Sequence, residues 1–266
     1  MKLSIITINL NNKYGLQKTV ESVISQTFID YEYIIIDGAS TDGSVDIIKQ
    51  NESKITYWIS EPDKGIYNAM NKGILQANGE YCLFLNSGDR LIDERVLEKV
   101  FLLNYSEDII YGNIIKIFSD NEKKRFSGVS KSNPTLCDLL LNFIPHQASL
   151  IKTNLFIKYG LYSEEYKIAS DHKFFIDSII FGNVSVKYIN MDISYYDTTG
   201  VSSTLVEETF MENNAIHESL FPIKVLQDIE ELTFYRKSRV INIYNKLRDN
   251  LFIVRLYNLI FHGKAK

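Results

Sequence analysis

The chain has 266 residues, of which 45% are hydrophobic and 23% charged, and its formal net charge is −4. This length allows one large domain or a domain with an appendage, and the composition is that of a globular protein with a sizeable core. The acidic balance argues against a protein that binds nucleic acid, because such proteins usually carry a basic excess.

The cysteine content and the first residues bear on the cell compartment. Two cysteines, Cys82 and Cys137, are too few for a disulfide framework or a zinc knuckle, which favours a reducing, cytoplasmic location. The N-terminal apolar run is short and lacks a cleavage site, so we expect no signal peptide. No stretch approaches the ~20 apolar residues of a membrane-spanning helix.

Strand and helix patterns alternate through the first 110 residues. Apolar runs predict strands at 3–8, 33–36, 55–59 and 81–85, and helical spacing predicts helices at 16–24, 44–48 and 66–77. This order predicts an α/β fold with a Rossmann-like, mostly parallel sheet flanked by helices.

The pattern changes after residue 105. Strands are predicted at 108–118, 125–129 and 184–189, and helices at 136–143, 154–159, 171–181 and from about 206 onward. We expect this part to be α+β material that shares the core of the first half.

Polar residues follow three of the predicted strands of the first half. Thr7 and Asn9 come at the end of the first strand, Asp37 ends the second, and Asn86 and Asp89 follow the last. Ligands of open α/β sheets bind outside the carboxyl ends of the strands, so these groups should converge on one crevice. Any one of them alone could be a helix cap, as Asp37 could be for the next helix. The carboxylate of Asp37 could equally accept hydrogen bonds from a base or a ribose.

The segment 86–89, Asn-Ser-Gly-Asp, has two interpretations. All four residue types form tight turns, and composition alone favours a turn. In its place after a buried strand, the carboxylate of Asp89 also suits a hard divalent cation that shares phosphate oxygens. Mg²⁺ or Mn²⁺ there could neutralise the charge that develops on a diphosphate leaving group.

Five blocks, in order and spacing, resemble those of the family-2 glycosyltransferases, inverting enzymes with the GT-A fold. The blocks are LSIITIN (3–9), SVISQTF (22–28), YIIIDGASTDGS (33–44), SEPDKGIYNAMNKG (60–73) and LNSGD (85–89). The resemblance implies a GT-A domain over 1–205, with a nucleotide-sugar-binding half at 1–105 and an acceptor half at 106–205. A helical C-terminal extension would occupy 206–266.

The resemblance also implies roles at matching positions in the donor site. Thr7, Asn9 and Asp37 would hold the nucleoside of a nucleotide-diphosphate sugar, with UDP as the expected nucleotide. Asp63 and Lys64 would lie near the ribose, the diphosphate or the donor sugar.

The Asp-x-Asp metal motif of the family falls on 86–89, where this chain departs from the pattern. Asn86 stands at the first carboxylate and Gly88 at the second, so Asp89 is left to bind Mn²⁺ or Mg²⁺ and Asn86 to contact the nucleotide. A single carboxylate with an amide should bind the metal more weakly than two carboxylates do.

Asp171 stands at the predicted start of a helix, in Ala-Ser-Asp-His at 169–172. On the residues alone it could simply cap that helix. The resemblance implies that it is the general base that takes the proton of the acceptor hydroxyl in a single displacement. Glu164 and Glu165 are the alternative bases.

Two further segments carry weaker signals. His146, in Pro-His-Gln-Ala at 145–148, would either line the acceptor or metal site or be an ordinary hydrogen-bonded residue. The segment 197–203, Asp-Thr-Thr-Gly-Val-Ser-Ser, would be either a lid over the donor or an ordinary loop.

The C-terminal segment 236–266 is basic, with eight Lys or Arg and one acid. Apolar residues at helical spacing predict a helix, with a stripe at Val240, Tyr244, Leu247, Leu251 and Val254. Such a helix could pack on the domain or on a second copy in a homodimer. It could also make peripheral contact with the anionic inner face of a membrane.

The sequence thus predicts a glycosyltransferase that passes a hexosyl or N-acetylhexosaminyl group from a nucleotide sugar to a glycan or lipid-linked acceptor, in surface polysaccharide or lipopolysaccharide biosynthesis. A non-catalytic sugar-nucleotide-binding module is one alternative, suggested by the depleted metal motif. A nucleotidyltransferase is the other. It would need a Gly-rich, Arg- or Lys-bearing signature where this chain has Asn-Asn-Lys-Tyr-Gly at 11–15.

Overall fold

The computed structural model describes residues 1–118, 120–200 and 205–237. The chain divides into two compact units, Met1–Asn214 and Ala215–Lys266. The described part of the second unit contains the C-terminal end of α9 (Val206–Leu220) and the whole of α10 (Ile223–Lys237). The domain boundary at residue 205 stays a prediction, and the predicted basic helix lies outside the described residues from 238 onward. None of the described helices is long and apolar enough to cross a membrane.

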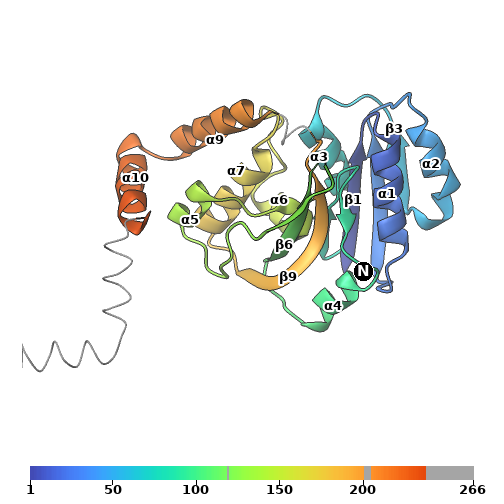
Figure 1. Cartoon of the computed structure of the whole chain (residues 1–266), viewed down its shortest axis with the longest axis horizontal. Helices are drawn as coiled ribbons and strands as arrows, with labels where there is room; N and C mark the ends of the chain where they lie inside the picture. The colour runs from blue at the N-terminus through green and yellow to red at the C-terminus, as the bar shows by residue number, and fades with distance from the viewer. Residues whose placement is uncertain (119, 201–204, 238–266) are drawn as a thin grey trace, which may run out of the picture. The chain divides into compact units, whose positions relative to one another are not determined.

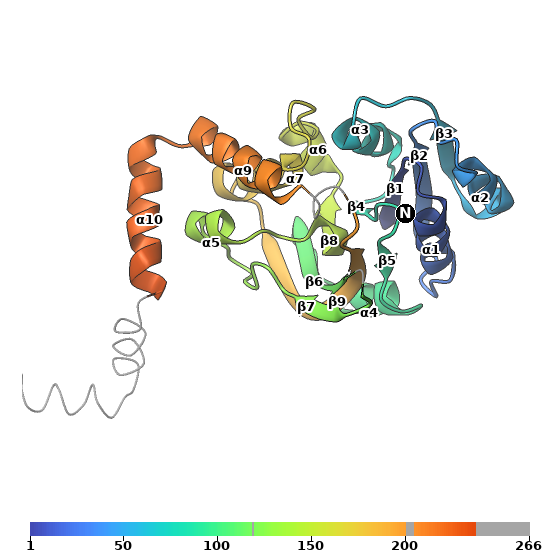
Figure 2. The same cartoon turned by 45° about the horizontal axis from the view of Figure 1, so that its top comes forward.

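Four parallel strands form the N-terminal half of the sheet (Figure 1), and their spatial order is β3-β2-β1-β4 (Figure 2). They are β1 (Leu3–Asn9), β2 (Tyr31–Asp37), β3 (Tyr57–Ser60) and β4 (Tyr81–Phe84). Every residue of β1 and β4 is buried. This burial explains their apolar runs, because parallel strands are covered on both faces.

Helices cover both faces of this half. They are α1 (Lys13–Ile24), α2 (Ser44–Gln50) and α3 (Ile66–Gln76), with a 3-10 turn at Glu52–Lys54. Ile5 packs in the cluster that includes Leu16 of α1, whereas Ile6 faces α3. A Cβ atom on Gly73 of α3 would lie 2.4 Å from Ile6 Cγ2, so glycine lets α3 approach the sheet closely. Because neighbouring strand residues point to opposite faces, α1 and α3 lie on either side of β1 (Figure 2).

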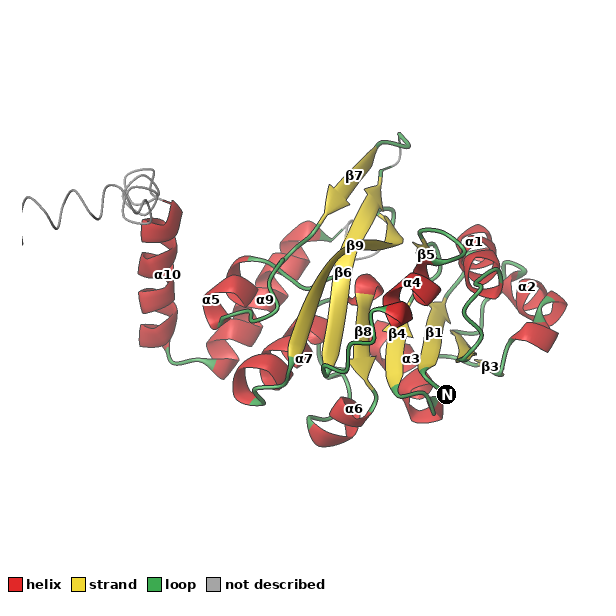
Figure 3. Cartoon of the chain, turned by 90° about the horizontal axis from the view of Figure 1, so that it is seen from below, coloured by secondary structure: helices red, strands yellow, loops and turns green. Residues whose placement is uncertain are grey.

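The second half of the sheet mixes strand directions (Figure 3). From β4 the order continues β8-β6-β9-β5, with β7 paired to β6. The strands are β5 (Arg90–Leu91), β6 (Ile109–Ile117), β7 (Lys123–Phe126), β8 (Ser149–Lys152) and β9 (Val186–Asp197). The helices are α4 (Val96–Leu102), α5 (Leu136–Leu141), α6 (Asn154–Lys158) and α7 (Ser170–Ile176), with a 3-10 turn at His146–Ala148 and a π-helical turn at Asp177–Phe181.

The predicted α/β architecture is confirmed, with one strand much longer than expected. The sequence predicts a strand only to residue 189, but β9 continues to Asp197 beside β6. Asn190 and Asp192 interrupt the apolar run that the prediction follows. Arg125 of the neighbouring hairpin donates hydrogen bonds to both side chains. These bonds satisfy the two polar side chains, so β9 continues through their positions.

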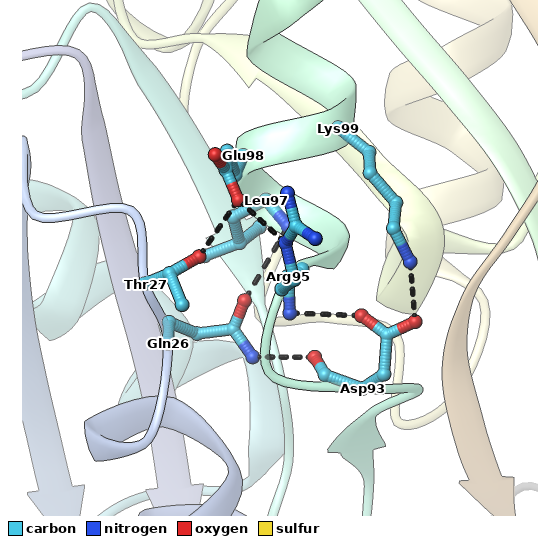
Figure 4. Close-up of polar contacts among 7 residues, drawn as sticks. All are labelled: Gln26, Thr27, Asp93, Arg95, Leu97, Glu98 and Lys99. Carbon is cyan, nitrogen blue, oxygen red and sulfur yellow. Dashed lines mark hydrogen bonds and ion pairs between the residues drawn. The ribbon is translucent and has the colours of Figure 1, made fainter.

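A polar network fixes the connection that follows β5, at the start of α4 (Figure 4). The Gln26 side chain, beyond the end of α1, donates to the Asp93 carbonyl (2.7 Å) and accepts from the Leu97 amide (3.4 Å). The Asp93 carboxylate accepts from the Arg95 amide (2.8 Å) and from Lys99 Nζ (2.6 Å). This network holds the segment after Asp89 against α1.

Candidate active site

The carboxyl ends of β1, β2 and β3 meet at Asp37. Asn9 Nδ2 donates to Asp37 Oδ1 (2.7 Å), while Ser60 Oγ (2.6 Å) and the Ser40 amide (2.9 Å) donate to Asp37 Oδ2. Asp37 is fully buried. A carboxylate offers about four acceptor positions, so these three bonds leave room for one more donor. Asp37 therefore ties three strand ends together and can still accept a bond from a ligand.

The two residues predicted from β1 lie in different surroundings. Thr7 is fully buried, and its hydroxyl shares a hydrogen bond (3.1 Å) with the Tyr33 hydroxyl. Asn9 Oδ1 is buried and has no hydrogen-bond partner among the described residues. Buried polar atoms are nearly always satisfied, so the Asn9 amide oxygen is an acceptor that a bound N–H or O–H group could fill.

The turn before α3 brings Asp63 to the same edge. A Cβ atom on Gly38 would lie 2.4 Å from Asp63 Oδ2, so the carboxylate rests against the backbone next to Asp37. Asp63 Oδ1 also accepts from the Gly65 amide (3.0 Å), which fixes the turn. Lys64 is exposed, and its amide donates to Asn68 Oδ1 (3.1 Å). Asp63 thus joins the Asp37 edge, and Lys64 stands at the surface of the turn.

The 86–89 segment is a tight turn held against α1. The Gly88 amide donates to Thr19 Oγ1 (3.0 Å), and that hydroxyl donates to the Asp89 carbonyl (2.6 Å). Gly88 has φ +109°, and a Cβ atom there would lie 3.3 Å from the Asp197 side chain. A side chain at position 88 would therefore be strained in this turn, which suits glycine.

Asp89 is buried in this turn beside the end of β9. Its Oδ1 accepts from the Asp197 amide (3.1 Å). Burial, with a contribution from the Asp197 charge, raises the pKa of Asp89 to about 7. Asn86 Oδ1 is also buried without a partner in the described part of the chain. A buried carboxylate whose negative charge has so few stabilising partners is suited to bind a cation.

These residues fit a Mg²⁺ or Mn²⁺ ion. Asp89, Asp197 and the Asn86 amide supply hard oxygen donors, and Mg²⁺ usually needs only one or two carboxylates when a substrate phosphate completes its shell. Within 1–118, 120–200 and 205–237, no three His, Cys, Asp or Glu side chains gather closely enough to hold a metal alone. A metal here would therefore depend on the phosphates of the donor. Sequence reasoning missed Asp197, which only the length of β9 brings to this turn.

Asp171 lies in the first turn of α7, and its carboxylate is held from two sides. Its Oδ1 accepts from the Tyr67 hydroxyl (2.8 Å), and its Oδ2 pairs with His146 Nδ1 (2.9 Å). Burial acts to raise the pKa of Asp171, but the hydrogen bond and charge of His146, together with Tyr67, outweigh it and lower the pKa. The side chain does not cap α7, so the capping interpretation is wrong for the carboxylate.

The residues around Asp171 come from distant elements. Tyr67 of α3 lies directly after the Asp63 turn, and its hydroxyl also reaches the Ile168 carbonyl (2.5 Å). His146 precedes β8; its Nε2 is buried and has no partner among the described residues. His146 is therefore a hydrogen-bonded partner of Asp171, and its second nitrogen remains available to a ligand. Tyr67 carries no sequence signal beyond its place in an amphipathic helix.

Glu164 and Glu165, the alternative bases, are placed differently. Glu164 accepts from Asn68 Nδ2 (3.0 Å) and Asn71 Nδ2 (3.1 Å), both on α3. The Glu165 amide is close to Ser163 Oγ (3.4 Å). Glu164 thus holds the loop before α7 against α3.

The predicted lid or loop at 197–203 is described only as far as residue 200, so its proposed role lies partly outside the described residues.

Known proteins with similar sequences are glycosyltransferases. Residues 4–160 match the family model for Glycosyl transferase family 2. An uncharacterized glycosyltransferase of Mycobacterium tuberculosis is 32% identical over 209 residues, which is 76% of this chain and 77% of the relative. A glycosyltransferase of PGL/p-HBAD biosynthesis from Mycobacterium bovis is 29% identical over 216 residues, covering 79% and 82% of the two chains.

Solved structures share the fold. Staphylococcus aureus TarS 1–349 in complex with UDP has a TM-score of 0.61 and 20% identity, over 78% of this chain and 63% of that one. This chain thus spans less than two thirds of that structure. The mannosyltransferase PcManGT of Pyrobaculum calidifontis, in complex with GDP-Man and Mn²⁺, has a TM-score of 0.55 and 10% identity, over 97% and 87% of the two chains. With its family match and its GT-A architecture, the chain belongs to glycosyl transferase family 2 and is a glycosyltransferase.

Proposed function

We propose that this glycosyltransferase inverts the anomeric configuration as it moves a sugar from a nucleotide-diphosphate donor to a hydroxyl group of the acceptor. The observation that carries the proposal is the Asp171 carboxylate, which Tyr67 and His146 hold in its ionised form. An inverting displacement needs a base opposite the leaving group, and an ionised carboxylate can accept the proton.

In the proposed step the acceptor oxygen attacks the anomeric carbon while its proton passes to Asp171. The bond from the anomeric carbon to the diphosphate oxygen breaks, and its electron pair leaves with the nucleoside diphosphate. Each Asp171 oxygen already accepts one hydrogen bond, which still leaves a lone pair for the incoming proton. Tyr67 and His146 fix the carboxylate in place, so no reorganisation is needed when the acceptor arrives.

For the donor we propose that Asn9 and Asp37 receive the nucleoside. Asn9 Oδ1 is buried without a partner among the described residues, and Asp37 accepts three of the about four bonds that a carboxylate can take. Thr7 would support this edge from the core, and Asp63 and Lys64 would face the ribose or the diphosphate. UDP is the proposed nucleotide, since TarS has been solved with UDP and with UDP-GlcNAc.

We further propose that Mn²⁺ or Mg²⁺ assists the donor. Asp89 would hold the ion, with Asp197 and the Asn86 amide oxygen beside it. When bound, the ion would neutralise the charge that develops on the departing diphosphate. The Mn²⁺ in the PcManGT complex supports this choice of metal.

The acceptor is proposed to be a glycan or a lipid-linked glycan of a surface polysaccharide. The relatives support this class: one is named for PGL/p-HBAD biosynthesis, and another is named a glucosyltransferase acting on a GalNAc(5)-diNAcBac-PP-undecaprenol. We propose a cytoplasmic enzyme that works at the inner face of the membrane. Cell fractionation tests this location, and recovery of the full chain in neither the cytosolic nor the membrane fraction would contradict it.

The non-catalytic alternative keeps one observation in its favour, the replacement of two carboxylates by Asn86 and Gly88. It differs from the proposal in its consequence, because a binding module would hold a nucleotide sugar without breaking it. Binding and turnover must therefore be measured separately.

A thermal-shift panel of nucleotide sugars tests the donor proposal. With Mn²⁺ present, a UDP-sugar at ~100 times its Kd should add about 2.7 kcal/mol of stability, which raises the Tm by several degrees for a chain of this size. Mn²⁺ alone, the free sugar and matched GDP- and ADP-sugars serve as controls. A panel in which no nucleotide sugar raises the Tm above Mn²⁺ alone would contradict the proposal.

A further inference from the structure

Glu212 on α9 binds three consecutive backbone N–H groups of the loop that leads into α7. Its Oε1 accepts from the Lys167 amide (2.8 Å), and its Oε2 accepts from the amides of Ile168 (2.8 Å) and Ala169 (3.0 Å). The partners lie 43 to 45 positions apart in the sequence. Hydrogen bonds to an ionised carboxylate are stronger than neutral ones, so one side chain fixes the whole segment.

The same segment carries the support of Asp171. The Tyr67 hydroxyl has a single proton, which it shares between the Ile168 carbonyl and Asp171 Oδ1. Ile168 is therefore held by its amide from Glu212 and by its carbonyl from Tyr67. Only Ser170 separates Ala169 from Asp171, so a shift of this segment would move the carboxylate directly.

The start of α7 lacks a cap of its own. Its N-cap residue is Ala169, which makes no side-chain capping bond. A negative charge near a helix N-terminus is favourable, because the peptide dipoles leave partial positive charge there. Glu212 places a carboxylate beside this N-terminus from a distant part of the chain, on the amides of the N-cap residue and of the two residues before it.

From these contacts we propose that Glu212 is a positioning residue for Asp171. It orders the 167–169 segment so that the first turn of α7 presents the carboxylate in one orientation to the acceptor. This inference rests on the proposed role of Asp171 as the base. It gives the N-terminal part of α9 a function in the reaction although Glu212 does not touch the reacting groups.

The test compares Glu212→Gln with Glu208→Gln, an exposed position on the same helix. Glutamine keeps the shape of Glu212 but only one of its oxygens, so bonds to the amides are lost. We expect kcat for sugar transfer to fall about tenfold to a hundredfold, since a misplacement of ~1 Å at a reacting group costs that much. The KM for the donor should stay within about twofold, and Glu208→Gln should match the wild type.

Hydrogen exchange supplies a readout that does not depend on turnover. In the full chain, the amides of Lys167, Ile168 and Ala169 should exchange faster in Glu212→Gln than in the wild type, whereas the β1 amides should not change. Unchanged exchange at these three amides would overturn the inference even if activity falls. Faster exchange with wild-type kcat would show that the segment is held but does not position the base.

An Asp171→Asn background separates this inference from the proposed function. If Glu212 acts through Asp171, adding Glu212→Gln to Asp171→Asn should cause no further loss of transfer. A further loss of tenfold or more would overturn the positioning role. If Asp171→Asn alone transfers sugar at the wild-type rate, the base assignment fails, while the exchange result still reports on Glu212 itself.

Discussion

Replacement of Asp171 by asparagine should lower sugar transfer by about 10² to 10⁴-fold, the range that a general base contributes. The amide has nearly the same shape, and its oxygen can still accept from Tyr67, so the fold of the site should survive. It cannot take the proton of the acceptor. Steady-state kinetics with a saturating donor measures this loss, and the Kd of the donor should change by less than about threefold.

Asp177→Asn is the matched control for this variant. Asp177 follows α7 directly and pairs with Lys173 at 2.5 Å, with both side chains about one quarter exposed. Removing such a partly exposed pair costs at most about 1 kcal/mol. Its kcat should remain within about twofold of the wild type. Wild-type turnover in Asp171→Asn would contradict the assignment of Asp171 as the base. Glu164, which α3 holds in place, would then be the next candidate base.

Replacement of Asp89 by asparagine should abolish the effect of metal on the enzyme. In the wild type, EDTA should reduce transfer and added Mn²⁺ or Mg²⁺ should restore it, because Asp89 is the carboxylate at the proposed metal position. In Asp89→Asn, transfer should be low and should not respond to either treatment. Wild-type activity that is indifferent to EDTA would remove the metal role from Asp89.

Asp89→Asn should also change the pH dependence of stability in the metal-free protein. The pKa of Asp89 is raised from 3.8 to about 7, so between these values the folded protein holds a proton that the unfolded chain has lost. Stability then falls as the pH rises through this window and stays reduced above it. One pKa unit is worth about 1.4 kcal/mol, so the variant should be more stable than the wild type by roughly 2 to 4 kcal/mol at pH 8.

This gain should become small near pH 4, where the wild-type carboxyl is neutral in the folded protein and about half-protonated in the unfolded chain. Urea unfolding at the two pH values, with EDTA present, measures the difference. Asp46→Asn, an exposed change on α2, controls for the loss of one negative charge. Equal stability of Asp89→Asn and wild type at pH 8 would show that the buried carboxylate is compensated by contacts other than those described.

The first half of the fold could be predicted because its strands are covered on both faces. Such strands have apolar sequences that stop abruptly, as β1 does at Asn9 and β2 at Asp37, and the stops mark the edge where ligands of open α/β sheets generally bind. The pairing of Asn9 with Asp37 follows from the parallel register of the two strands, which sets these residues side by side.

The other half of the site depends on contacts that no local pattern records. Asp197 reaches Asp89 only because β9 runs on past two polar positions that Arg125 satisfies. Tyr67 and Glu212 meet the loop before α7 from positions about 100 residues before it and about 45 after it. Propensity and periodicity act over a few residues, so tertiary contacts of this span lie beyond them.

The most direct test of the central claim is the anomeric configuration of the sugar that the enzyme releases. Proton NMR can follow an α-linked UDP-sugar with Mg²⁺, which is diamagnetic, and with water as the only acceptor, at early times before mutarotation. The account predicts that the wild type forms UDP and the β-anomer first, and that Asp171→Asn forms neither at a measurable rate. Initial release of the α-anomer by the wild type, or equal release by both proteins, would contradict it.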